Sequence, residues 1–339
     1  MTTMTLLGLM AMLSLPSVAG HATPYAYQLS SANRFGIDVY AQADTQNDTS
    51  TPPLSLQLPE AAQLVGENGW VLLYFDLLFV KDGDPSSCVN GCLPHRWQVD
   101  AVRQAYALRL RPVVRLGQWS RRIRDFADDG AGHLNFTRLA QSYKTFAAAL
   151  PLPPDGSSVL PVQLLNEPNV CGAWQCQEGA HSYLPATSAA AEVAGCLRDL
   201  VHALRPLPRL ALSVTPIAQV SFSRCECTAP FKPVVPQNAS ADSFVRLMVR
   251  AVPTLFDDVE FLTVHAYPSK CNLGFDAPAN RASLASYQSF HQLVEAQRKR
   301  QPVPEGRPQT LPVLVGETGW QGLNQSLKAT AFSWVKRVI

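Results

Sequence analysis

Two glutamates each follow a short apolar run of the kind that forms a buried strand. Glu167 comes directly after Asn166 at the end of one run, and Glu317 comes directly after Gly316 at the end of another. Two carboxyl groups that face each other about 5–5.5 Å apart can cleave a glycosidic bond with retention of configuration. The side chains for this chemistry are therefore present, provided that the fold brings the two run ends together.

That reaction would give the two glutamates different tasks. The nucleophile must be ionised to attack the sugar, so Glu317 needs hydrogen-bond donors, and Arg115 and Tyr267 are the nearest candidates in the pattern. Glu167 must hold a proton for the leaving group. It must then accept a proton from water once the glycosyl ester on Glu317 has removed the neighbouring negative charge. One pair of side chains would thus serve both half-reactions.

The elements that must position these residues repeat along the chain. Seven short apolar runs recur at intervals of 35 to 51 residues. Near-continuous hydrophobicity without alternation predicts strands that are covered on both faces. The predicted strands are Phe35–Tyr40, Trp70–Leu77, Arg111–Gly117, Pro161–Asn166, Leu210–Thr215, Phe261–His265 and Pro312–Gly316.

Amphipathic helices are predicted between these strands. Apolar residues at helical spacing form stripes over 136–150, 193–204 and 284–294. Strands that alternate with helices predict an α/β fold with a parallel sheet, and both an open doubly wound sheet and a closed (β/α)8 barrel fit that alternation. The first strand is followed by no glycine-rich phosphate-binding turn, and the chemical residues gather at the C-terminal ends of strands. Both observations favour the TIM-barrel type.

Only seven strands are visible, and the spacing would place an eighth beyond residue 339. We therefore expect a barrel whose C-terminal part is truncated. Metal hydrolases of this fold need a His-x-His pair in the first strand, and Schiff-base aldolases need a lysine at a strand end. The chain has neither, so we expect no metal and no cofactor.

Three motifs resemble the cellulase-type clan of retaining glycoside hydrolases. They are Leu164–Asn169 (LLNEPN), Val264–Pro268 (VHAYP) and Val313–Trp320 (VLVGETGW). The resemblance covers the last four predicted strands well and the earlier ones in outline. It implies a glycosidase on a (β/α)8 barrel that hydrolyses O-glycosidic bonds, with a poly- or oligosaccharide as its substrate.

The resemblance also implies roles for single residues. Glu167 corresponds to the general acid/base, Glu317 to the nucleophile, Asn166 to the residue that binds the sugar 2-hydroxyl and Tyr267 to the tyrosine that orients the nucleophile. The clan's arginine lies near the second strand end, where this chain has an aspartate, and Arg115 lies on the third strand instead. A non-catalytic carbohydrate-binding protein on a degenerate barrel is therefore the alternative.

Four further residues near the strand ends are predicted to bind substrate. His265 either contacts the sugar or is a core histidine, and Arg115 either contacts the site or neutralises a neighbouring aspartate. Trp174 and Trp320 follow the two glutamates and could stack on sugar faces, although tryptophan is also a common packing residue.

Composition and the N-terminus indicate where the protein acts. Lys+Arg number 28 against 26 Asp+Glu, giving a net charge of +2, and 47% of residues are hydrophobic, so neither a nucleic-acid partner nor a disordered chain is expected. Leu6–Leu15 is apolar but too short to span a bilayer, and small residues follow it. We expect residues 1–22 to be a signal peptide and 23–339 to be a secreted barrel, with no membrane attachment after cleavage.

The sequons and cysteines agree with secretion. Asn-x-Ser/Thr sequons occur at Asn47, Asn135, Asn238 and Asn324, which predicts a glycoprotein. Eight cysteines are an even number, and their spacings match no common zinc site, so disulfides in the loops after the strands are favoured. The cysteines are Cys88, Cys92, Cys171, Cys176, Cys196, Cys225, Cys227 and Cys271.

Overall fold

The structure is a computed structural model of the 339-residue chain. It describes residues 9–13, 33, 35–39, 54–75, 93–117, 127, 134–156, 158–168, 174, 186–214, 217–218, 241–266, 286–299 and 309–318. All statements about the fold and the site refer to these residues.

Nine strands and six helices alternate along the described parts of the chain. The strands are β1 (Leu9–Leu13), β2 (Phe35–Val39), β3 (Trp70–Phe75), β4 (Arg111–Leu116), β5 (Leu160–Leu164), β6 (Leu210–Ser213), β7 (Ile217–Ala218), β8 (Leu262–Ala266) and β9 (Val313–Thr318). The helices are α2 (Leu54–Val65), α3 (Arg96–Ala107), α5 (Phe136–Ala148), α6 (Ala186–Leu204), α7 (Ala241–Ala251) and α8 (Ser286–Arg298).

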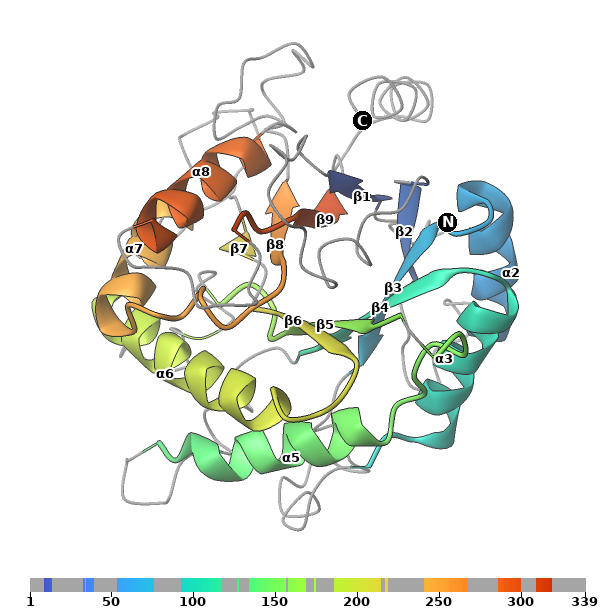
Figure 1. The fold of residues 1–339 in the computed structure, drawn as a ribbon, viewed down its shortest axis with the longest axis horizontal. Coiled ribbons are helices and arrows are strands. Elements are labelled where there is room, and N and C mark those ends of the chain that lie inside the picture. The colour runs from blue at the N-terminus through green and yellow to red at the C-terminus, as the bar shows by residue number, and fades with distance from the viewer. Residues whose placement is uncertain are drawn as a thin grey trace, which may run out of the picture.

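The strands form one curved sheet inside a ring of helices (Figure 1). Their order is β6-β5-β4-β3-β2-β1-β9-β8-β7, and every pair except those made by β1 is parallel. A parallel bridge links Ser213 of the end strand β6 to Phe261, the residue before β8, which is the neighbour of the other end strand β7. The chain therefore has the predicted α/β fold of the TIM-barrel type.

The seven strands predicted from apolar runs are confirmed as β2, β3, β4, β5, β6, β8 and β9, with ends that shift by one or two residues. The helical stripes are confirmed as well, because the apolar residues of α5 and α6 are buried against the sheet. Asn135 caps α5 through a hydrogen bond that its side-chain oxygen accepts from the Thr137 N–H at 3.0 Å. The other three predicted glycan acceptors lie outside the described residues.

The place of an eighth strand is filled from the N-terminus. Strand β1 lies between β2 and β9 and runs antiparallel to both, with Met10 opposite Gly36 and Met12 opposite Leu314. These residues belong to the segment predicted to be a signal peptide, and that assignment remains a prediction. In the full chain the sheet is thus continuous at this point, through a strand of the opposite direction.

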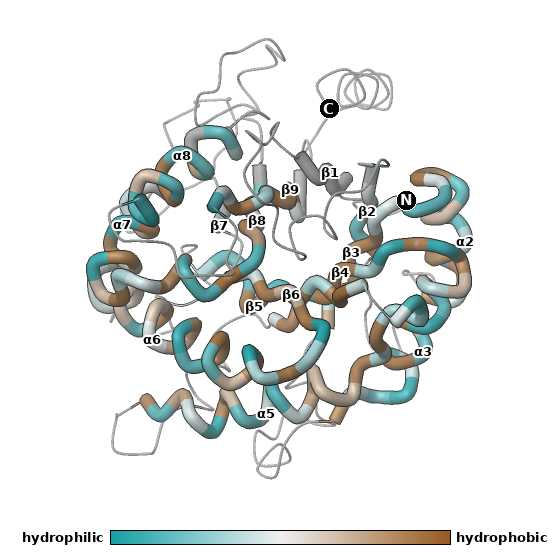
Figure 2. Tube along the Cα trace, in the orientation of Figure 1, coloured by the Kyte–Doolittle hydropathy of each residue, from teal (hydrophilic) through white to brown (hydrophobic). Residues whose placement is uncertain are grey.

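Two apolar layers sit on the two faces of the sheet. Alternate strand residues pack against the helices in one large cluster, and Figure 2 shows the strands as mostly hydrophobic. The intervening residues form a separate cluster on the other face, inside the barrel. This inner cluster consists of Trp70, Leu72, Val113, Val159, Ala211, Phe261 and Leu314.

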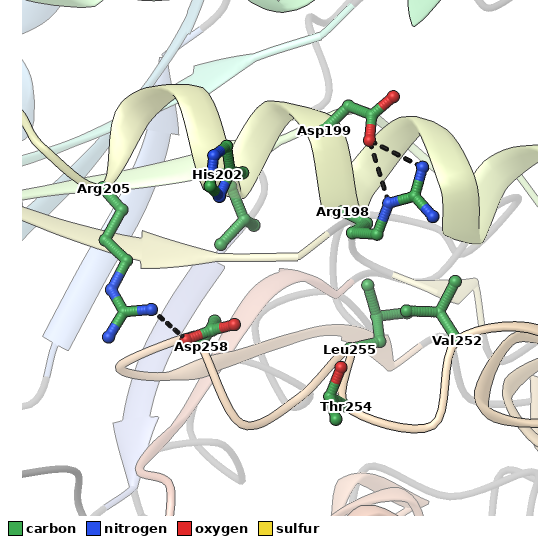
Figure 3. Close-up of a pocket in the computed structure, with 9 residues that line it drawn as sticks. Arg198, Asp199, His202, Arg205, Val252, Thr254, Leu255 and Asp258 are labelled. Carbon is green, nitrogen blue, oxygen red and sulfur yellow. Dashed lines mark hydrogen bonds and ion pairs between the residues drawn. The ribbon is translucent and has the colours of Figure 1, made fainter. Parts of the chain in front are cut away.

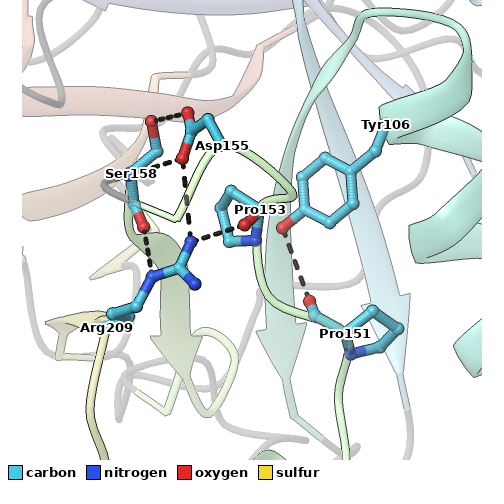
Figure 4. Close-up of polar contacts among 6 residues, drawn as sticks. All are labelled: Tyr106, Pro151, Pro153, Asp155, Ser158 and Arg209. Atoms are coloured by element: carbon cyan, nitrogen blue, oxygen red, sulfur yellow. Dashed lines mark hydrogen bonds and ion pairs between the residues drawn. The ribbon is translucent and has the colours of Figure 1, made fainter.

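The end of the barrel where the strands begin is held by polar contacts between loops. Arg209, before β6, donates from Nε to the Ser158 carbonyl oxygen at 3.0 Å and from Nη2 to the Pro153 carbonyl oxygen, and it pairs with Asp155 (Figure 4). The Tyr106 hydroxyl of α3 donates to the Pro151 carbonyl oxygen at 3.5 Å, and burial raises the pKa of this phenol.

A shallow pocket of about 260 Å³ opens at the same end (Figure 3). It lies between the C-terminal turns of α6 and the segment that links α7 to β8. Arg205, directly after α6, spans it to Asp258 at 2.6 Å, and Arg198 of α6 pairs with its neighbour Asp199. Because the lining residues precede β6 and β8, this pocket is remote from the strand ends that carry the candidate chemistry.

Candidate active site

The polar residues of the barrel interior lie one step along the strands from its apolar layer. Moving two residues toward the C-terminal end leads from Leu72 to Tyr74, from Val113 to Arg115 and from Ala211 to Ser213. Side chains two residues apart share a face of a strand, so these polar groups also point into the barrel. The interior thus changes from apolar to polar toward the end where Glu167 and Glu317 are found.

Arg115 is the charged centre of this polar layer and is only 2% exposed. Its Nε donates to Oε1 of Gln163 on β5 at 3.2 Å, and its Nη2 lies 3.1 Å from Nε2 of His265 on β8. Its guanidinium carbon lies 5.5 Å from the centre of the Tyr74 ring, within cation–π range. Arg115 therefore connects strands β3, β4, β5 and β8 through their inward side chains.

His265 joins this layer to the first candidate carboxylate. The ring is fully buried, and its Nδ1 lies 2.6 Å from Oε1 of Glu167, whose side chain is 15% exposed. At this separation the two atoms are joined by a short hydrogen bond. Glu167 is thus anchored from beneath through one oxygen, while part of its side chain reaches solvent.

The backbone around Glu167 is held in an uncommon conformation. Leu165 has φ of +62° and Glu167 has φ of +41°, both in the left-handed region, which costs an ordinary residue about 1–3 kcal/mol. The Leu165 N–H donates to the Leu116 carbonyl oxygen at 2.8 Å, and Gly117 lies so close that a Cβ there would be 3.0 Å from the Leu165 carbonyl carbon. The end of β4 therefore contacts this turn closely, and in the resulting conformation the Glu167 side chain reaches His265.

Asn166 lies between these two strained residues and is half-buried. Its Oδ1 is shielded from solvent and meets no hydrogen-bond donor among the residues that the structure describes. A buried amide oxygen without a donor is costly, and such groups concentrate at functional sites. This oxygen is free to accept a hydrogen bond from a hydroxyl group brought in by a ligand.

The second glutamate reaches the same place through strand pairing. Val264 of β8 is opposite Val315 of β9, but His265 is opposite Glu317, so the register skips Gly316 at a bulge. A Cβ on Gly316 would lie 3.3 Å from Nε2 of His265 and 3.5 Å from Nη2 of Arg115. The bulge glycine therefore leaves room for the arginine–histidine contact, and it puts the backbone of Glu317 beside His265.

The structure differs from the sequence analysis in the place of two predicted substrate-binding residues. The stacking role predicted for Trp174 does not fit its position: the ring is 4% exposed, packs on Phe136 and donates from Nε1 to Glu192 at 2.9 Å. Arg115, predicted either to contact the substrate site or to neutralise an aspartate, has its side chain below Glu167, and Gln163 and His265 are among its contacts; its role toward substrate stays a prediction.

The remaining predicted site residues are only partly described. Tyr267 and Trp320 lie outside the described residues, and for Glu317 the structure describes the strand but not the side chain. Seven of the eight cysteines also lie outside, whereas Cys196 is a free thiol, fully buried in α6, where burial raises its pKa. Cys196 is thus not part of a disulfide.

Three residues of the site were missed from the sequence. Gln163 and Tyr74 hold Arg115 from within their strands, and Gly316, named in the sequence only as the residue before Glu317, leaves room for it. The signal that could have found them is the two-residue step from the apolar interior layer toward the C-terminal ends.

The described residues contain no group of three side chains that could hold a metal ion. Among the same residues, no helix has both the length and the apolar character needed to cross a membrane.

Comparisons with known proteins agree at the level of the fold. No protein-family model and no curated protein sequence matches the chain. A family 39 glycoside hydrolase from the gut symbiont Bacteroides cellulosilyticus WH2 superposes with a TM-score of 0.51 at 12% identity, over 89% of this chain and 53% of that one. A GH5-4 broad specificity endoglucanase from Clostridium acetobutylicum has a TM-score of 0.45 at 12% identity, over 87% of this chain and 79% of that one.

The chain thus spans about half the length of the family 39 enzyme. The resemblance to barrel glycoside hydrolases that the three motifs predicted is confirmed for the fold.

Proposed function

We propose that the protein is a retaining glycoside hydrolase that cleaves O-glycosidic bonds in a poly- or oligosaccharide, with Glu167 as acid/base and Glu317 as nucleophile. The observation that carries this proposal is the position of His265, which contacts the Glu167 carboxylate at 2.6 Å and is the strand partner of Glu317. Residues 150 positions apart in the chain (167 and 317) thereby meet at one residue.

In the first step the Glu317 carboxylate attacks the anomeric carbon while Glu167 gives its proton to the departing oxygen, so that the glycosidic bond breaks and a glycosyl ester forms. In the second step Glu167 takes a proton from water, and the resulting nucleophile releases the sugar from Glu317 with its original configuration. The partly exposed Glu167 side chain suits both transfers, because it is held on one side and open on the other.

The neighbouring residues would bind the sugar. The buried Asn166 Oδ1, which meets no donor among the described residues, suits acceptance of a hydrogen bond from the 2-hydroxyl. Tyr267 would orient Glu317, and Trp320 would stack on a sugar face. His265 and Arg115 act below the carboxylate rather than on the sugar itself.

A non-catalytic carbohydrate-binding protein is the second candidate. Two observations favour it: Arg115 contacts His265 and Gln163 rather than lying at the second strand end, and the eighth strand position holds an antiparallel strand. In that case the residues around Glu167 would bind sugars without cleaving them.

Substitution of the nucleophile separates the two candidates. The wild type, Glu317→Gln and a control, Glu67→Gln at an exposed surface position, are assayed on 4-nitrophenyl glycosides of several sugars and on soluble polysaccharides. We expect the control to match the wild type and Glu317→Gln to lose about 10³-fold or more in kcat. Unchanged turnover in Glu317→Gln would refute its role. Sugar binding without hydrolysis in the wild type, retained after loss of either glutamate, would support the second candidate.

We further propose that the protein enters the secretory pathway, loses residues 1–22 and carries glycans and disulfides. The apolar N-terminal segment and the four sequons support this, and the seven cysteines other than the free thiol Cys196 are enough for up to three disulfides. N-terminal sequencing and mass measurement of the protein secreted from eukaryotic cells test it, and retention of Met1 in that protein would contradict it.

A further inference from the structure

The contact between Arg115 and His265 determines which ring nitrogen carries the hydrogen. A guanidinium group has five N–H donors and no acceptor. Because Nη2 of Arg115 lies 3.1 Å from Nε2 of His265, Nε2 must present its lone pair to be hydrogen-bonded there. The hydrogen of the neutral ring is then on Nδ1, which faces Oε1 of Glu167 at 2.6 Å.

We propose that Arg115 and His265 are positioning residues that assign the two oxygens of Glu167: Oε1 accepts the Nδ1–H of His265, and Oε2 carries the proton that is transferred to the leaving group. This inference rests on the proposed function of Glu167. The proton that leaves Oε2 in the first step is replaced from water in the second, and His265 keeps its own hydrogen throughout.

Three neighbours hold Arg115 in the orientation that this assignment needs. Gln163 accepts the Nε–H at 3.2 Å, the Tyr74 ring packs beside the guanidinium, and Gly316 leaves a space that a methyl group would fill to within 3.5 Å of Nη2. The arginine is 2% exposed, so water competes little for its donors. The Arg115 guanidinium, which determines the tautomer of His265, is therefore held by residues of three strands, β3, β5 and β9.

Loss of Arg115 would allow the opposite arrangement. Without the guanidinium, Nε2 can carry the hydrogen, and Nδ1 then presents its lone pair to Glu167. Oε1 must in that case hold the carboxyl proton in order to donate to Nδ1. The proton would be on the oxygen that is buried against His265 instead of the one available to substrate.

A direct test follows the ring nitrogens of His265. The full-length protein is labelled with 15N-histidine, and the His265 signals are identified by their loss in His265→Asn. In the wild type we expect Nδ1 to be protonated and Nε2 to be unprotonated, and in Arg115→Met we expect a mixture of both tautomers. A wild-type ring with its hydrogen on Nε2 would overturn the inference, and this outcome would leave the glycosidase proposal intact.

A kinetic test uses the leaving group. Phenyl and 2,4-dinitrophenyl glycosides are compared for the sugar that the wild type cleaves fastest, because phenol needs a proton to leave and dinitrophenol does not. We expect Arg115→Met to lose about 10²-fold in kcat on the phenyl glycoside and less than about threefold on the dinitrophenyl glycoside. Arg115→Lys, which keeps a donor without an acceptor, should recover part of the loss.

Arg298→Met is the matched control, because Arg298 is a second buried arginine that lies at the other end of the barrel and is 3% exposed. It should lower stability without changing the ratio of the two rates. An equal loss on both substrates in Arg115→Met would mean that Arg115 is merely structural. A wild type that cleaves neither glycoside would overturn the proposed function. The 15N measurement on His265 would still show which ring nitrogen carries the hydrogen.

Discussion

The two ends of the barrel use buried charge in different ways. Where the strands begin, Glu295 accepts hydrogen bonds from the Leu311 N–H at 3.0 Å and from Arg298 at 3.3 Å, and Arg298 also donates to the Gln309 carbonyl oxygen. These contacts fasten helix α8 to the segment that leads into β9. Where the strands end, Arg115 contacts the side chains of Gln163 and His265. The charged groups at the first end bind the backbone, and those at the second bind the side chains around the candidate acid.

Backbone strain shows the same contrast. Arg109 and Arg209 adopt φ near +60° in turns that lead into β4 and β6, where their side chains stay at least partly exposed. Leu165 and Glu167 adopt positive φ around the candidate acid. Strain in the first pair is a by-product of turning the chain, whereas in the second pair it aims a carboxylate, and strain of this kind concentrates at functional sites.

The largest expected effect comes from removing the candidate acid. Glu167→Gln should lower kcat on a phenyl glycoside by about 10³-fold, since general acid catalysis contributes about 10²–10⁴-fold. Its free energy of unfolding, measured by urea titration, should change by less than about 1 kcal/mol, because the amide oxygen can still accept from His265. Glu60→Gln, at an exposed position on α2, is the control and should change neither quantity. Normal turnover in Glu167→Gln would contradict a catalytic role for the end of the barrel that carries Glu167.

The converse effect is expected at the other end of the barrel. Glu295→Gln should reduce the free energy of unfolding by about 3 kcal/mol, because it leaves the buried Arg298 without its closest negative partner. Turnover per folded molecule should stay the same. Urea titration and kcat measured on the same sample check this, and a large loss of kcat with unchanged stability would contradict the division between the two ends.

Glu295 and Asp257, two carboxyl groups near Arg298, should give the free energy of unfolding opposite pH dependences. Burial would raise the pKa of Glu295, but the nearby His291 ring, the hydrogen bond from the Leu311 N–H and the charge of Arg298 outweigh it, so that the pKa is lowered from 4.5. A lowered pKa means that Glu295 contributes stability above about pH 4.5 and loses it as the pH falls further. The difference in unfolding free energy between wild type and Glu295→Gln should therefore shrink between pH 6 and pH 3.

Asp257 is the matched control for this titration, because its pKa shifts in the opposite direction. Burial raises that pKa, against the opposing charge of Arg298 at 4.0 Å. The stability that Asp257 contributes in its protonated form is lost as the pH rises through its folded pKa, so the wild type should lose stability relative to Asp257→Asn as the pH increases. If the unfolding free energy of both variants ran parallel to that of the wild type at every pH, the titration of neither carboxyl group would be coupled to folding.

The smallest expected effect concerns strain that has no catalytic purpose. Arg109 has φ of +57°, and its side chain forms an exposed ion pair with Glu67 at 2.9 Å. Arg109→Gly should raise the free energy of unfolding by about 0.5 kcal/mol, because relief of the left-handed strain exceeds the loss of a surface pair. Thermal unfolding measures the change, with Arg103→Gly in the middle of α3 as a control that should destabilise.

The sequence predicts most of the barrel because each strand is a compact apolar run between helical stripes. It also predicts that Glu167 and Glu317 lie at strand ends, since the position of a residue in its run needs no tertiary information. It does not predict the contact between Arg115 and His265, because these residues are 150 positions apart and the barrel brings them together. Trp174 was misplaced for a related reason: whether an indole stacks on sugar or packs between helices depends on the neighbouring helix faces.

If residues 1–22 are removed as proposed, the loss of the antiparallel strand β1 affects the rest of the sheet. Cleavage near residue 20 or 22 would remove Leu9–Leu13, and β2 and β9 would then each have a row of backbone N–H and C=O groups without partners. Open edges of this kind pair readily with other chains, which leads to aggregation or strand exchange. The processed protein must therefore acquire a replacement strand at this seam or remain prone to self-association, and a synthetic LMAML peptide that restores its solubility would reveal the vacant position.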